Sequence, residues 1–156
     1  MDKRLIKNAN IVTDSSVFKG DVLIDGEAIE CIGRDIDCPD AEQIDASGRL
    51  LLPGAVDVHT HMDLDAGIAR ACDDFYSGTV AAACGGTTTI VDHMAFAHED
   101  VSLMHQVEEY HRLADGNAVI DYGFHGVLLL MNDSKLAEMR SIAEREGITS
   151  WKAYIR

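Results

Sequence analysis

Basic side chains are scarce in this sequence: 13 Lys and Arg residues stand against 27 Asp and Glu residues, and the formal net charge is −14. Nucleic acids and anionic membranes are bound by basic surfaces, so this charge balance argues against both partners. No apolar run approaches the roughly 18 residues that a membrane span requires. The residues after Met1 lead only into a short apolar patch, so we expect no secretory signal and a cytoplasmic protein.

Cysteine is also scarce, and its spacing carries no metal or redox motif. The four cysteines, Cys31, Cys38, Cys72 and Cys84, contain no Cys-x-x-Cys pair, which excludes zinc-knuckle and thioredoxin-like readings. Free thiols in a reducing compartment are the simplest account of them. The sequence shows no internal repeat and no low-complexity segment. Its 156 residues, of which 47% are hydrophobic, are enough to form an ordinary core.

The first third of the chain has the pattern of short β-strands. Apolar runs at 5–12 and 20–29 are broken by Gly, Asn and Asp, and Asp25-Gly26 is a typical hairpin turn. We therefore expect residues 1–52 to form a β-rich segment. This segment contains no catalytic candidate.

From Pro53 onward the pattern changes to strands that alternate with helices. We predict strands at 56–61, 87–93 and 118–130, and a fourth strand that contains Lys152. Helices are predicted at 74–84, 101–114 and 134–146, with Asp73 and Ser134 as N-caps of the first and third. This alternation is typical of a parallel α/β arrangement, and we expect residues 53–156 to form it.

The strongest candidate site is the segment Asp57-Val58-His59-Thr60-His61. Side chains alternate along a strand, so His59 and His61 point to the same face, about 6.5 Å apart. Two imidazoles at one strand end can hold one metal ion. Taken alone, such a pair is also compatible with ordinary surface or core histidines.

A second candidate is Lys152, which lies in an apolar, strand-like segment between Trp151 and Tyr154. Burial disfavours the charged ammonium, and a neutral lysine can react with carbon dioxide to give a carbamate that bridges two cations. The alternative is an edge-strand lysine whose ammonium reaches solvent.

Together these segments resemble the dihydropyrimidinase/hydantoinase family of the amidohydrolase superfamily, nearest to bacterial enzymes of the D-phenylhydantoinase type. The Asp-x-His-x-His and Ser-Trp-Lys segments carry the resemblance, and further matching stretches lie between them at 67–75, 81–89 and 92–94. The resemblance implies an α/β fold: about half of a TIM-barrel metal-dependent hydrolase, preceded by part of a small β-sandwich domain. Four strands cannot close an eight-stranded barrel, so we expect the chain to be the N-terminal portion of a longer protein.

The resemblance also implies an activity, namely the metal-dependent opening of cyclic amides such as hydantoins or dihydropyrimidines. His59, His61 and Lys152 would be metal ligands, with carboxylated Lys152 bridging two divalent ions, zinc or manganese. A metal-activated hydroxide would attack the ring amide carbon, and the family's general-base aspartate would lie beyond Arg156. The family tends to form homotetramers. The alternatives are allantoinase or dihydroorotase activity, or a non-catalytic scaffold related to dihydropyrimidinase.

The resemblance also implies that Leu64 lies in the loop that forms an apolar pocket for the ring substituent, and that Tyr154 is not the family's substrate-orienting tyrosine.

The remaining polar residues receive mainly structural interpretations. Asp57 is interpreted as a hydrogen-bonding neighbour rather than a ligand, with ligation left open. The other candidates are a turn carboxylate at Asp63, helix caps at Asp73 and Asp74, structural histidines at His93 and His125, and loop or helix-surface histidines at His98, His105 and His111.

Overall fold

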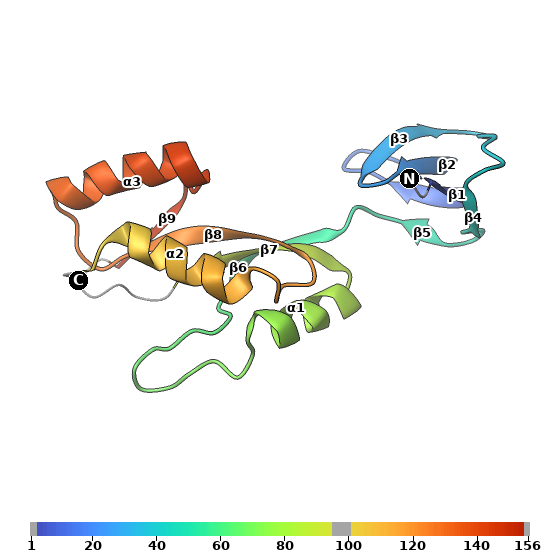
Figure 1. The fold of residues 1–156 in the computed structure, drawn as a ribbon. Coiled ribbons are helices and arrows are strands. Elements are labelled where there is room, and N and C mark those ends of the chain that lie inside the picture. The colour runs from blue at the N-terminus through green and yellow to red at the C-terminus, as the bar shows by residue number, and fades with distance from the viewer. Residues whose placement is uncertain (1–2, 95–100, 155–156) are drawn as a thin grey trace. The chain divides into compact units, whose positions relative to one another are not determined.

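The computed structural model describes residues 3–94 and 101–154, which form two compact units, 1–53 and 54–156 (Figure 1). His98, which was interpreted as a loop histidine, lies outside the described residues. No helix in the described part of the chain is long and apolar enough to span a membrane.

The first unit is a mixed β-sheet. Its strands are β1 (Lys3–Val12), β2 (Val17–Asp25), β3 (Ala28–Gly33), β4 (Glu42–Asp45) and β5 (Leu50–Leu51). The sheet has the order β3-β2-β1-β4, with β5 also paired to β1; β1 is antiparallel to β2 and parallel to β4 and β5. The turn at Asp25-Gly26 joins β2 to β3 as predicted, and Gly26 has the positive φ of 61° that such turns require.

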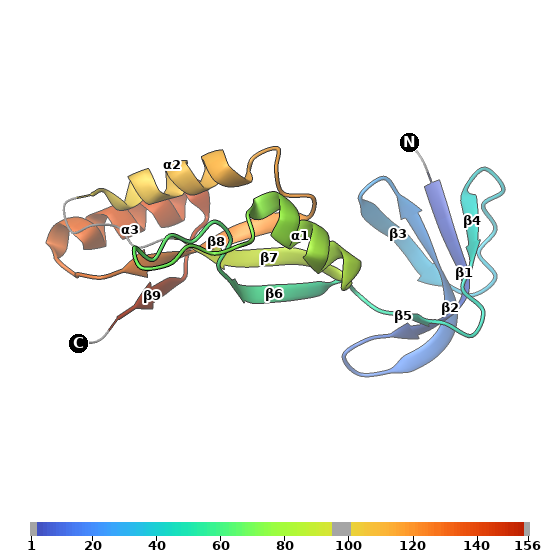
Figure 2. The same ribbon diagram turned by 90° about the horizontal axis from the view of Figure 1, so that it is seen from below.

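The second unit alternates strands and helices. Its elements are β6 (Ala55–Thr60), α1 (Phe75–Cys84), β7 (Thr87–His93), α2 (Leu103–Ala114), β8 (Asp121–Leu128), α3 (Asp133–Glu146) and β9 (Trp151–Ala153). The strands are parallel and lie in sequential order, β6-β7-β8-β9. Figure 2 shows the three helices on one side of this sheet. Sequential parallel strands with helices on one face form a curled half-barrel, which confirms the predicted α/β fold class.

The core of the second unit lies between this sheet and its helices. Phe75, Tyr110 and Phe124 pack edge to face, with ring centroids 5.8–6.3 Å apart. Leu103, Val107 and Tyr110 are all buried on one face of α2, as their helical spacing predicted. Aromatic and aliphatic burial of this kind anchors the helices to the sheet, and so fixes where the strands end.

Two predicted helix caps are wrong by one or two positions. α1 begins after Asp74 rather than Asp73, because the Asp74 carboxylate accepts from the amide of Ser77 in a capping box. α3 begins after Asn132 rather than Ser134, because the Asn132 side chain accepts from the amide of Lys135. In both cases the predicted and the observed cap lie within two positions of each other, both residue types can cap, and the sequence alone does not rank them.

Candidate metal centre

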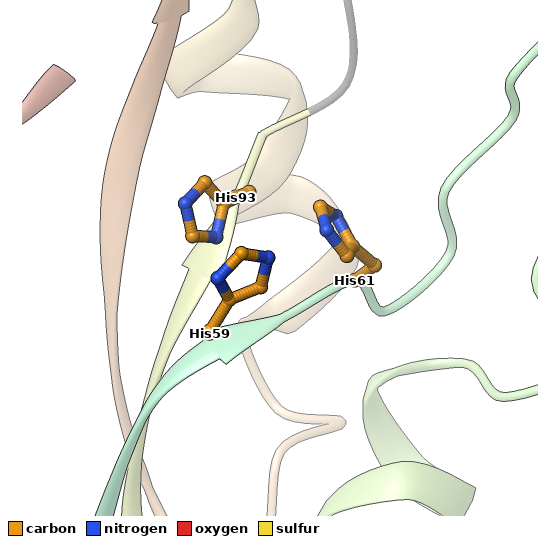
Figure 3. Close-up of side chains that lie close together, drawn as sticks. All are labelled: His59, His61 and His93. Atoms are coloured by element: carbon orange, nitrogen blue, oxygen red, sulfur yellow. The ribbon is translucent and has the colours of Figure 1, made fainter. Parts of the chain in front are cut away.

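The first strand of the half-barrel delivers two histidines to its carboxyl end. His59 and His61 lie at the end of β6, on the same side, with ring centroids 5.2 Å apart. The strand register places Thr60 opposite Asp92, so the end of β7 brings His93 beside them. The ring of His93 lies 4.3 Å from that of His59 and 5.2 Å from that of His61. Figure 3 shows the three imidazoles gathered at these two strand ends.

These three side chains can offer ligand nitrogens that lie within 4.8 Å of one another. Nitrogens bound to one tetrahedral zinc ion are about 3.3–3.4 Å apart, given bonds of about 2.0–2.1 Å, so modest ring rotations would suffice. His61 Nδ1 and His93 Nδ1 are buried and have no hydrogen-bond partner among the described residues. Buried polar atoms are rarely left unpaired, so these two nitrogens fit a metal ion.

The electrostatic surroundings keep the imidazoles of His61 and His93 in the form that binds metals. Burial lowers the pKa of His61, and the nearby charges of Lys152 and His59 lower it further. Burial and the neighbouring His59, then His125, lower the pKa of His93 to about 4. Both rings are therefore neutral near pH 7, with lone pairs available to a cation.

Lys152 lies on β9 and is half-buried, opposite Val127 of β8. After burial, its charge is one of the causes that lower the pKa of both His61 and His93. Its Nζ atom also lies 5.4 Å from the ring centroid of Tyr154, in a cation–π contact. Leu64 is half-buried in the loop after β6, where its carbonyl accepts from the amide of Ala71. Its role in a substrate pocket stays a prediction.

Asp92 connects the ends of the same two strands, β6 and β7. It is fully buried, and its Oδ2 atom accepts from the Thr60 hydroxyl at 2.6 Å and the Met62 amide at 2.8 Å. Burial raises the pKa of this carboxyl to about 6, against the lowering effect of those hydrogen bonds. The carboxylate therefore ties the turn after His61 to the end of β7.

The structure refines several sequence interpretations. Asp57 accepts a hydrogen bond from the amide of His59 at 3.0 Å, as its hydrogen-bonding interpretation expected. Asp63, expected as a turn carboxylate, has a positive φ of 53° and accepts from the amide of Phe75. His105 is exposed on α2, whereas His111 on the same helix is half-buried and lies within 3.3 Å of the Tyr122 hydroxyl.

Sequence reasoning did not predict that His93 lies in the cluster with His59 and His61. We interpreted it as a structural histidine with satisfied hydrogen bonds, but its Nδ1 atom has no such partner in the described part of the chain, and its ring contacts His59. The Asp-His pair at the end of a predicted parallel strand was the available signal, because such ends meet at one edge of a sheet.

The second unit is thus a parallel half-barrel with three histidines gathered at the carboxyl ends of its first two strands. No family model matches the chain. It is 49% identical over 152 residues to a D-phenylhydantoinase of Escherichia coli O1:K1, covering 97% of this chain and 33% of that protein. The dihydropyrimidinase from Brevibacillus agri superposes with a TM-score of 0.92 at 47% identity, covering 96% of this chain and 32% of that one. A D-hydantoinase from a Bacillus species gives a TM-score of 0.90 at 42% identity, covering 95% and 32%.

These matches confirm the resemblance: over nearly its whole length, the chain is homologous to the dihydropyrimidinase/hydantoinase family and matches the N-terminal region of its members. It spans about a third of the length of the curated relatives it matches.

Proposed function

We propose that this chain is the N-terminal part of a metal-dependent hydrolase that opens cyclic amides of the hydantoin or dihydropyrimidine class. The observation that carries the proposal is the cluster of His59, His61 and His93, with buried unpaired nitrogens, in a chain 49% identical to a D-phenylhydantoinase. The overall reaction adds water across the ring C–N bond, so the carbonyl carbon gains oxygen and the leaving nitrogen gains a proton.

Within this proposal, His59 and His61 would hold a divalent metal ion, zinc or manganese, and Lys152, as a carbamate, would be a ligand of this ion and of a second one. A bound divalent ion would lower the pKa of its water and polarise the substrate carbonyl. The neutral imidazoles supply nitrogen lone pairs, and Leu64 contacts the substituent on the substrate ring. The general base is expected from a later part of the longer protein.

Carboxylation of Lys152 resolves an electrostatic conflict in the cluster. Burial is the main cause that lowers the pKa of His61 and His93, and the charge of an ammonium at Lys152 lowers both further, so it disfavours any added positive charge there. When the lysine amine adds to carbon dioxide and releases a proton, the side chain becomes a carbamate with one negative charge. The same position then attracts divalent cations instead of repelling them.

The test is ring opening by the longer protein that carries this chain, freed of metal and then loaded with zinc or manganese. We expect hydrolysis of phenylhydantoin or dihydrouracil, loss of activity without metal, and loss in the Lys152→Ala variant. The 156-residue chain alone is the matched control and should be inactive, since four strands leave the barrel open.

Failure of the metal-loaded longer protein to open phenylhydantoin, dihydrouracil and allantoin would contradict the proposal. Turnover of allantoin alone would instead favour allantoinase activity. A non-catalytic scaffold would neither bind metal nor open any of these rings.

A further inference from the structure

The peptide group between Val58 and His59 is held by two side chains. The β6–β7 ladder pairs Asp57 with Ile90 and Thr60 with Asp92, so β6 advances three residues while β7 advances two. Within the described ladder, neither Val58 nor His59 has a partner residue on β7. Such an extra residue bends a strand and re-aims a side chain, and it is common beside active sites.

Both polar atoms of this peptide group find side-chain partners. The N–H of His59 donates to Asp57 Oδ1 at 3.0 Å. The carbonyl of Val58 lies 3.0 Å from His125 Nε2. A carbonyl oxygen only accepts, so Nε2 carries a hydrogen, and Nδ1 is hydrogen-bonded to the hydroxyl of Ser150.

His125 also contacts the histidine cluster directly. The register of β7 and β8 pairs it with His93, and the two ring centroids lie 4.8 Å apart. The side chain therefore extends from β8 past His93 to the backbone of β6, and its other nitrogen reaches Ser150, the residue before β9. His125 of β8 thus contacts β6, His93 of β7 and the residue that precedes β9.

We infer that Asp57 and His125 are positioning residues that fix the His59 imidazole for metal binding, by holding the Val58–His59 peptide group at its N–H and at its carbonyl. This inference rests on the proposed function, since it assigns His59 as a ligand. A positioning role for Asp57 differs from a role as a metal ligand. Positioning requires only an acceptor oxygen on this side chain and not its negative charge.

The test is a cobalt(II) titration of the 156-residue chain, read by the d–d absorption of the bound ion, with two pairs of variants. His125→Leu removes the donor, whereas His125→Gln keeps an N–H near the position of Nε2. Asp57→Ala removes the acceptor, whereas Asp57→Asn keeps a carbonyl oxygen without the charge. His105→Ala, on the exposed face of α2, is the control.

We expect His125→Leu and Asp57→Ala to weaken cobalt affinity roughly 10- to 100-fold and to shift the absorption bands, as loss of a ligand-orienting partner does. The cobalt affinities of His125→Gln and Asp57→Asn should stay within about threefold of that of the unmodified chain, because these variants keep the orienting hydrogen bond. In the metal-free protein, amide hydrogen exchange at His59 should speed up in the two disruptive variants and not in the two conservative ones. Circular dichroism identifies any variant that has lost its fold.

Equal cobalt affinity and spectra in all variants would overturn the inference while leaving the metal site intact. A tenfold or greater loss in Asp57→Asn would also overturn it and would assign Asp57 as a ligand. If the unmodified chain binds no cobalt at all, the metal-site proposal fails, and the inference fails with it.

Discussion

Two buried aspartates, one in each unit, differ in how their oxygens are satisfied. In the first unit, Asp21 Oδ1 accepts from the amide of Asn8 at 2.8 Å and Oδ2 from the amide of Ile36 at 3.0 Å. The bond from Asn8 is the main cause that lowers the pKa of Asp21. In the second unit, Asp92 Oδ1 has no partner among the described residues, and burial raises the pKa of this carboxyl to about 6.

The difference separates a structural site from a candidate functional one. Asp21 joins β2 to β1 and to the segment after β3, and it leaves none of its own oxygens unpaired. Asp92 lies beside histidines whose buried nitrogens also lack partners. Unpaired buried groups cost stability, so their concentration around one point is expected where binding compensates the cost.

The largest expected effect concerns the metal ligands. His61→Ala should weaken zinc or cobalt affinity by roughly 60- to 700-fold, because structural zinc sites gain about 10–16 kcal/mol from four ligands, or about 2.5–4 kcal/mol per ligand. Isothermal titration measures the affinity, and His105→Ala should leave it unchanged. Unchanged affinity in His61→Ala would remove the histidine cluster as the metal site.

The second prediction compares the two aspartates directly. Asp21→Asn should lower the free energy of unfolding by about 2–3 kcal/mol. The new amide N–H₂ replaces a carboxylate oxygen and then faces a backbone N–H, a donor with which it cannot form a hydrogen bond. Asp92→Asn should cost less than about 1 kcal/mol, because its amide can take the place of the oxygen that has no partner. Urea unfolding of both variants measures the difference. Equal costs would contradict the contrast between the units.

A third prediction concerns the strand that carries Lys152. A Cβ added at Gly126 would lie 2.1 Å from Cε3 of Trp151, which covers this glycine across the β8–β9 pair. Gly126→Ala should therefore displace Trp151 and cost about 1–3 kcal/mol by overpacking. Gly123→Ala is the matched control on the same strand, since a Cβ there meets nothing within 4 Å. Thermal unfolding compares the two variants.

The smallest expected effect is the loss of unfolding free energy in the first unit as the pH falls. Because the pKa of Asp21 is lower in the folded state, the unfolded chain takes up this proton first as pH falls. Its stabilisation is thus fully present above the unfolded value of about 4 and is lost as pH falls through the folded pKa. The difference in unfolding free energy between the unmodified chain and Asp21→Asn should shrink over that range. A difference that is constant with pH would contradict this assignment.

The sequence predicted the elements that have strong local signals. Strand β7 and the hairpin at Asp25-Gly26 follow from residue types and turn chemistry, and the helical spacing of Leu103, Val107 and Tyr110 gives the buried face of α2. His59, His61 and Lys152 were found because they lie in motifs that a family resemblance picks out.

The missed features depend on register between strands. The contacts of His93 with His59, and of His125 with the Val58 carbonyl, follow from an extra residue in β6 and from the pairing of His93 with His125. No local sequence pattern determines the register between two parallel strands. Asn132 was missed, and Asp73 was preferred to Asp74, for a different reason: Ser134 and Asp73 are also residue types that cap helices.

The most direct test of the metal site is anomalous diffraction at the zinc edge from crystals of the zinc-loaded chain. We predict an anomalous zinc peak about 2.0–2.1 Å from one nitrogen of His59 and one of His61. A zinc peak elsewhere, with these two imidazoles uncoordinated, would contradict the metal site and the proposed function that depends on it.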